Sequence, residues 1–343
     1  MLIQKNISGI TILLIVFFIA SCSESTISPT PDKESIAPLK TESSAVNSQG
    51  DRDLNLSNVK SMDEVNDMLA ERGLNVRLAY AETVTLEDNL QKETKGKKGD
   101  KVTKATGQTI FADDRNLRLE AQWVPGDERR NAEGNKLTYL IDQTWMPANF
   151  GTPSEIDGNA AIDASFDTWN TIKKNSKLEI VKRADTGEQP SSFFIGGNPF
   201  LADISEIGFL PGIFFDFVLG PGASSNVLGV TFTSVFVDDE GNPTDINNDG
   251  YADVAFKEVW YNDAFQWTND ANGPGVDIET VALHENGHAL GFGHFGKVFV
   301  TEGNNKIHTA PRAVMNAVIL GTQRELLGTD KASFNSIYGN WPK

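Results

Sequence analysis

The sequence is poor in the residues that mark disulfide-stabilised, nucleic-acid-binding or membrane-spanning proteins. It contains one cysteine, Cys22, so no disulfide can form within the chain. Its 30 lysines and arginines are outnumbered by 47 aspartates and glutamates. The resulting net charge of −17 argues against nucleic acid and anionic lipid surfaces as partners. The 343 residues, of which 39% are hydrophobic, suffice for one large domain with appendages.

An apolar run near the N-terminus indicates export. It extends from Ile10 to Ala20 behind Lys5, is too short to span a bilayer comfortably, and is typical of a signal-peptide core. Ile19-Ala20-Ser21-Cys22 resembles the lipobox of bacterial lipoproteins, in which the cysteine is lipidated and becomes the first mature residue. We therefore expect a signal peptide in residues 1–21, a lipid anchor at Cys22, and a location in the bacterial cell envelope, at the outer membrane or cell surface. An ordinary signal peptide with a nearby cysteine is the alternative.

Three of the four histidines lie in one stretch, His284 to His294, with the pattern H-E-x-x-H-x-x-G-x-x-H. On a helix His284 and His288 share a face and can bind one metal ion. Gly291 can adopt a left-handed conformation and turn the chain so that His294 adds a third ligand. Three protein ligands leave a position for water, as in catalytic zinc sites. Glu285 is placed to take a proton from that water.

This stretch resembles the zinc-site motif of metzincin metallopeptidases, and the likeness extends over residues 136–343. Asp277 to Leu283 leads into it like the active-site helix of matrixin-like metzincins, with Asp277 as a natural N-cap. Ala313-Val314-Met315-Asn316 resembles the Met-turn, whose methionine forms an apolar floor beneath the metal. Leu327 to Gly339 resembles the closing helix. The resemblance implies a zinc endopeptidase with Glu285 as general base.

The same resemblance implies an α+β fold with a mixed, twisted five-stranded sheet, an active-site helix and a C-terminal helix. Apolar segments fit the expected strands: Leu137–Ile141, Leu178–Val181, Ala202–Ile204, Val227–Val237 and Glu258–Tyr261. Ile162, Phe166 and Trp169 repeat at helical spacing between the first two. By resemblance, Val227–Val237 is the edge strand beside the cleft, where an extended peptide could pair.

Two segments separate the signal peptide from the peptidase-like region. Residues 22–55 are rich in Ser, Thr, Pro and charge, and we expect a disordered tether. We expect residues 56–130 to form a small N-terminal subdomain or a prosegment, in which Ser61 and Glu64 fit a capping box and Val76, Leu78 and Tyr80 alternate like a strand. The lysine-rich stretch from Gln91 to Lys104 is a solvated loop or a processing site. Matrixin prosegments commonly block the zinc with a cysteine. Because Cys22, the single cysteine, is expected to carry the lipid, we do not expect such a cysteine switch here.

A second metal site is indicated by Asp245-Ile246-Asn247-Asn248-Asp249-Gly250-Tyr251-Ala252-Asp253. Its oxygen ligands at alternate residues, with glycine at the sixth position, match most of an EF-hand-type calcium loop. The expected structural calcium ligands are Asp245, Asn247, Asp249, the Tyr251 carbonyl and Asp253. Phe256 replaces the bidentate glutamate of a regular EF-hand. A polar turn held by side-chain hydrogen bonds is the alternative.

These observations predict a monomeric, lipid-anchored zinc endopeptidase that acts on extracellular or envelope proteins. Zinc is the expected catalytic cofactor, bound by His284, His288 and His294. Two alternatives remain open. One is a non-catalytic, surface-binding lipoprotein on a metzincin scaffold. Such a protein could lose Glu285 without losing the fold, yet Glu285 is present. The other is a zinc hydrolase of non-peptide substrates, which would lack the edge strand and elongated cleft.

Overall fold

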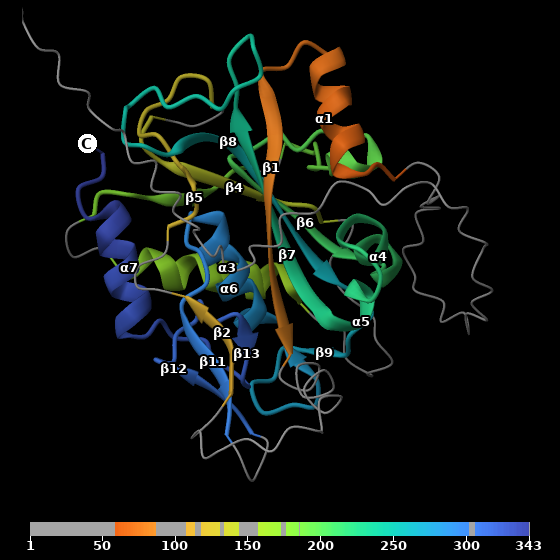
Figure 1. Ribbon diagram of the computed structural model, residues 1–343, viewed down its shortest axis with the longest axis vertical. Helices are drawn as coiled ribbons and strands as arrows, with labels where there is room; N and C mark the ends of the chain where they lie inside the picture. The colour runs from red at the N-terminus through yellow and green to blue at the C-terminus, as the bar shows by residue number, and fades with distance from the viewer. Residues whose placement is uncertain are drawn as a thin grey trace, which may run out of the picture.

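A computed structural model of the chain describes residues 59–86, 108–113, 118–130, 134–143, 157–172, 176–184, 186–301 and 306–342, with backbone alone for 108–113. The predicted signal peptide, tether, lipidation site and lysine-rich stretch lie outside these residues. Among the described helices, none has the length and apolar character needed to cross a membrane. The described part combines helices with a large mixed sheet, which is compatible with the expected α+β class (Figure 1).

The large sheet has eight strands in the order β13-β1-β7-β8-β6-β4-β5, with β3 paired beside β8. Strands β4, β5, β6 and β8 run parallel, and β7 runs antiparallel to both β8 and β1. Their bounds are β1 Val76–Leu86, β3 Ala121–Gln122, β4 Leu137–Ile141, β5 Ile180–Lys182, β6 Ile204–Leu210, β7 Val227–Phe236, β8 Ala252–Asn262 and β13 Val318–Ile319.

Two smaller sheets accompany it. One joins β2 (Gln108–Asp113), β11 (Gly296–Val300) and β12 (Ile307–Ala310), and the other pairs β9 (Trp267–Thr268) with β10 (Val276–Asp277). The described strands that precede residue 130 therefore pair with strands of the 136–343 region. This part of the chain is interwoven with the rest of the fold.

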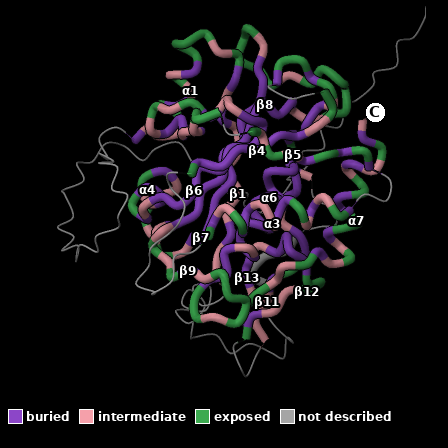
Figure 2. The backbone as a smooth tube through the Cα atoms, turned by 180° about the vertical axis from the view of Figure 1, so that it is seen from behind, coloured by how far each residue is buried: buried purple, intermediate pink, exposed green. Residues whose placement is uncertain are grey.

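The large sheet separates two hydrophobic cores. The first contains residues of α3 (Gly158–Asn170), α6 (Ile278–Ala289) and α7 (Gly328–Tyr338), and the second contains residues of α1 (Met62–Glu71), the 3-10 helix η2 (Phe193–Ile195) and α4 (Gly212–Leu219). A further short helix, α5 (Ala223–Asn226), follows α4. Figure 2 shows the buried backbone concentrated along the sheet and α6. The zinc-motif helix α6 is thus packed centrally against the sheet.

Local signals in the sequence explain several of these elements. The predicted capping box of α1 is formed, because Ser61 accepts the backbone N–H of Glu64 and the Glu64 carboxylate accepts that of Ser61. Helix α3 buries Ile162, Phe166 and Trp169 at the predicted helical spacing. The structure therefore confirms both local predictions, the capping box of α1 and the helical spacing in α3.

Two expectations about the sheet are wrong. It has eight strands where five were expected, because β1 and β13 extend the row β5-β4-β6-β8-β7 beyond β7, and β3 pairs with β8 outside that row. Strand β7 is also not an edge strand, since β1 pairs with it from Val76, opposite Phe236, to Thr85, opposite Val227. The alternation in β1 was visible in the sequence, but its partner was not, because pairing over so long a separation leaves no local signal.

Candidate metal centre

Helix α6 begins and ends as its sequence predicts. Asp277 is its N-cap. Gly291 has a left-handed φ of 85°, and its N–H donates to the His288 carbonyl at 2.8 Å. The next N–H, of Phe292, donates to the Gly287 carbonyl at 3.0 Å. These two bonds form a Schellman motif, which ends the helix and redirects the chain toward the third histidine.

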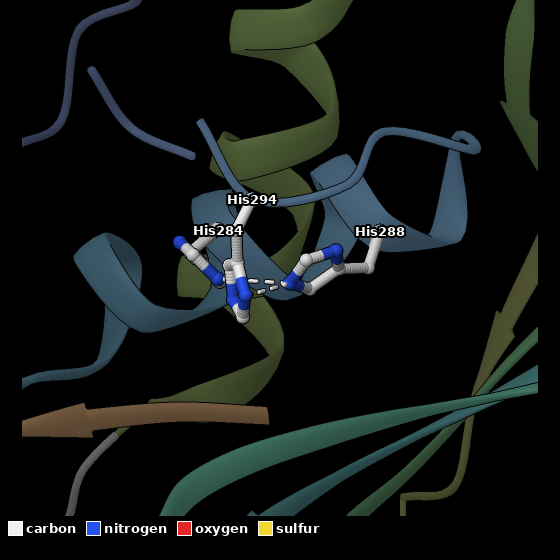
Figure 3. Close-up of side chains that lie close together, drawn as sticks. All are labelled: His284, His288 and His294. Atoms are coloured by element: carbon white, nitrogen blue, oxygen red, sulfur yellow. Dashed lines mark hydrogen bonds between the residues drawn. The ribbon is translucent and has the colours of Figure 1, made fainter. Parts of the chain in front are cut away.

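The three histidines of the motif converge at one point (Figure 3). Nε2 of His288 lies 3.0 Å from Nε2 of His284 and 3.2 Å from Nε2 of His294. The first two side chains are fully buried, and that of His294 is half-buried. Among the described residues, these three histidines form the group whose potential ligand atoms all lie within 4.8 Å of one another, which is close enough to hold one metal ion.

Backbone groups fix how these imidazoles are turned. Nδ1 of His284 is 2.7 Å from the Val314 carbonyl, and Nδ1 of His288 is 2.7 Å from the Phe292 carbonyl. His294 hydrogen-bonds to the backbone of Thr83. A carbonyl accepts, so Nδ1 of the first two rings must carry the proton, which leaves their Nε2 lone pairs facing the centre of the cluster.

The electrostatics of the cluster fit a cation. Burial lowers the pKa of His284 to about 4 and that of His294 to about 3. Burial, with the neighbouring imidazoles, also lowers the pKa of His288 well below 6.5. The rings are therefore neutral at neutral pH, and their lone pairs repel one another unless a positive charge lies between them. Three neutral imidazoles are a donor set that suits zinc and other late transition metals.

Glu285 lies beside this cluster and is fully buried. Its Oε2 accepts a 2.7 Å hydrogen bond from the Thr231 hydroxyl on β7, while no described group bonds to its Oε1. The carboxylate fits against β7 because residue 229 is glycine, where a Cβ would lie 2.9 Å from Glu285 Oε1. Burial raises the pKa of Glu285 well above 4.5. One carboxylate oxygen is thus held by β7, and the other is left for a ligand.

The predicted Met-turn packs beneath the zinc-motif helix. Met315 is only 2% exposed, and a Cβ at Gly287 would lie 2.2 Å from its Sδ and 3.1 Å from Cζ2 of Trp169. Glycine at the fourth motif position therefore lets the thioether approach α6. Asp330 of α7 holds the turn, because its carboxylate accepts the backbone N–H groups of Val314 and Met315 at 3.1 and 3.3 Å.

Three further residues fix the end of α6, and nothing in the sequence singled them out. Each donates a side-chain hydrogen bond to a carbonyl at the end of the helix, where the acceptors lack the regular intrahelical partner four residues on. The pairs are Trp123 with Ala289 at 2.9 Å, Lys257 with His288 at 2.7 Å, and Tyr338 with Leu290 at 2.6 Å. They come from distant parts of the chain, so only the folded structure reveals them. Thr231 and Thr83 were missed for the same reason.

The predicted calcium loop is exposed, and its side chains hydrogen-bond within the loop, as the alternative of a polar turn also requires. Asp245 accepts the backbone N–H groups of Asp249 at 3.0 Å and Gly250 at 2.9 Å. Asn247 donates to Asp249 at 3.0 Å, and the Tyr251 N–H donates to Asp249 at 3.0 Å. Gly250 has the left-handed φ, 87°, expected at the sixth position. These bonds bring the first three acid and amide side chains together.

The last predicted calcium ligand, Asp253, has other partners. It is fully buried, and its Oδ2 lies 2.7 Å from the Arg129 guanidinium and 2.6 Å from the Thr244 hydroxyl. A guanidinium on this carboxylate opposes a cation there, so calcium coordination by Asp253 would require Arg129 to move. Calcium binding by Asp245, Asn247, Asp249 and the Tyr251 carbonyl stays a prediction.

No model of a known protein family matches the chain, and no curated protein does.

Proposed function

We propose that this protein is a zinc-dependent endopeptidase with a matrixin-like metzincin catalytic domain, and that Glu285 is its general base. The observation that carries the proposal is the juxtaposition of three convergent imidazoles with a buried carboxylate whose second oxygen has no bonding partner among the described residues. The Met-turn packing of Met315 against Gly287 supports the metzincin assignment.

In this proposal the chain's own groups carry the proton transfer. His284, His288 and His294 would hold the zinc, which when bound supplies Lewis acidity and makes a water molecule acidic near neutral pH. Oε2 of Glu285 is anchored on Thr231, so Oε1 can take a proton from a nucleophilic water and later deliver it to the leaving amine. No serine or cysteine nucleophile is required.

The best alternative is a surface-binding lipoprotein that keeps the scaffold without catalysis. Such a protein would have no use for a buried carboxylate, which costs free energy unless every oxygen is satisfied. Glu285 retains that costly arrangement, with Oε1 unbonded. This observation favours an enzyme over a binding protein.

We further propose that the enzyme is exported and anchored through Cys22 in the bacterial envelope, and that it cleaves proteins there as a monomer. These proposals rest on the N-terminal sequence alone. A structural calcium ion in the Asp245–Asp253 loop completes the proposal.

The proposed function is tested with zinc-loaded protein and its Glu285→Gln variant on a peptide library, with and without a zinc chelator. Both proteins should bind one zinc per chain. Endopeptide cleavage should require zinc and should fall by several orders of magnitude in the variant. Equal cleavage by the variant would contradict the role of Glu285, and cleavage that survives zinc removal would contradict the metallopeptidase itself.

A further inference from the structure

Helix α4 has one buried face and one apolar face that is open to solvent. Phe214, Phe215 and Val218 are buried in the second core. Ile213 and Phe217 are four residues apart, so they share the other face, and each is 48% exposed. They are two of the three exposed large hydrophobic side chains in the described part of the chain. Single exposed apolar residues are common, but a pair on one helix face indicates a contact surface, here called the α4 surface.

The surroundings of the α4 surface carry almost no charge. From Ile207 to Phe236 the sequence has a single charged residue, Asp216, although 22% of all residues are charged. The Asp216 carboxylate accepts the backbone N–H of Ser224 at 2.9 Å and the hydroxyl of the same residue at 2.6 Å. This stretch contains no lysine or arginine, so it offers no cation to an anionic partner.

The first described residues lie on the same side of the large sheet as α4. Val59 is buried in the core that contains α4, and the N–H of Lys60 donates to the Phe194 carbonyl at 2.7 Å. Figure 1 shows α1 and α4 on one side of β7 and β8, and Figure 2 shows the same division from behind. Cys22 precedes Val59 by 37 positions, which span at most roughly 130 Å. The chain from Cys22 thus joins the fold on the side of the α4 surface, but a tether of that length does not by itself fix how the fold faces a membrane.

The size of the α4 surface selects its occupant. A stable protein interface buries about 800 Å² on each partner. A phenylalanine offers about 150–250 Å² in full, so two side chains that are each 48% exposed offer on the order of 200 Å². That area is too small for a second copy of the chain. It suffices for a bilayer, because a lipid anchor keeps the surface at a high local concentration and the two side chains need only set the orientation.

We propose that Ile213 and Phe217 insert into the apolar boundary of the bilayer that holds the lipid anchor, and that this contact needs no anionic lipid. Helix α6, which carries the metal ligands, packs in the core on the opposite side of the large sheet. The metal cluster therefore faces the aqueous phase when α4 faces the membrane, and protein substrates reach it from that side. The inference goes beyond peptide cleavage and rests on the proposed anchor at Cys22.

The first test locates the α4 surface with a fluorescent residue. The exported chain is coupled through the Cys22 thiol to a maleimide-bearing lipid in phosphatidylcholine vesicles with brominated acyl chains, because bromine quenches tryptophan only on contact. The described native tryptophans are at most 6% exposed, and the wild type measures their background. Phe217→Trp should lose more than half of its added fluorescence. Ala332→Trp, at an exposed position of α7 across the sheet, is the control and should keep it. Equal quenching of the two variants, or none in Phe217→Trp, would overturn the proposal.

The second test measures the contact without the anchor. In a Cys22→Ser background, Ile213→Ser should lower the partition coefficient onto phosphatidylcholine vesicles roughly fivefold or more, as judged by flotation. Ile246→Ser is the matched control, because Ile246 is 54% exposed and lies outside the α4 surface, and its partition should stay within twofold. Equal losses in the two variants would overturn the proposal. Partition that requires added phosphatidylglycerol would overturn the inferred lipid class.

The anchor and the remaining occupant are tested separately. Mass spectrometry of the protein from bacterial envelopes shows whether Cys22 carries acyl chains. Their absence would contradict the proposed anchor, while the chemically coupled vesicles decide the α4 surface in either case. Sedimentation without vesicles should show a monomer. A wild-type dimer that Ile213→Ser dissociates would overturn the proposal and identify the occupant as a second copy.

Discussion

Replacing Gly287 by alanine tests the contact between the zinc-motif helix and the Met-turn. In a helix interior this change normally stabilises a protein by about 0.8–1.0 kcal/mol. Here the new Cβ would lie 2.2 Å from Sδ of Met315, a side chain that is 2% exposed and packed beside Trp169. Overpacking a core costs about 1–3 kcal/mol. We therefore expect a net loss of roughly 1 kcal/mol.

The assay is denaturant unfolding of the full chain, with two matched comparisons. Gly328→Ala, at the first residue of α7, has no atom within 4 Å of the added Cβ and should not destabilise. Met315→Ala alone should cost about 2–5 kcal/mol. In that background Gly287→Ala should become neutral or stabilising, with a coupling energy of about 1–3 kcal/mol. If Gly287→Ala stabilises the wild type as much as it stabilises the Met315→Ala protein, the packing argument is wrong.

Three further predictions follow from single contacts. Thr231→Val removes a hydrogen bond to the Glu285 carboxylate that is worth about 1.5–3 kcal/mol, so kcat should fall roughly 10–100-fold while the zinc content stays unchanged. Thr231→Ser should restore kcat. An unaltered kcat in Thr231→Val would show that this bond does not position Glu285. Calcium at a hundredfold excess over Kd should stabilise the wild-type protein by about 2.7 kcal/mol and should leave the stability of the Asp249→Ala variant unchanged. If calcium does not raise the melting temperature of the wild type, the loop is only a turn. Burial raises the pKa of Glu206 from 4.5 to about 8, so the stability that this group contributes is present below pH 4.5 and is lost as pH rises through about 8. Between pH 5 and pH 9 the melting temperature should therefore fall less in Glu206→Gln than in the wild type. Equal falls in the two proteins would refute this assignment.

The zinc-motif helix could be predicted from sequence because its determinants are local. Asp277 caps the helix, Gly291 ends it, and the spacing of His284 and His288 places them on one face. The capping box of Ser61 and Glu64 is predictable for the same reason. Such signals span only a few residues, so they need no knowledge of tertiary structure.

The surroundings of the site could not be predicted in this way. Strand β1 was recognisable by its alternation, but its position between β7 and β13 depends on pairing with residues more than a hundred positions away. Thr231 and Lys257 resemble ordinary strand residues in the sequence, and their roles depend on β7 and β8 lying against α6. The engagement of Asp253 by Arg129 is equally non-local, and it changes the expected calcium ligands.

The most direct measurement of the central claim is the rate of peptide-library cleavage by zinc-loaded protein with glutamate or glutamine at position 285. We expect cleavage with glutamate and a loss of several orders of magnitude with glutamine at equal zinc content. Equal rates with glutamate and glutamine, or no cleavage by any folded, zinc-loaded protein, would contradict it.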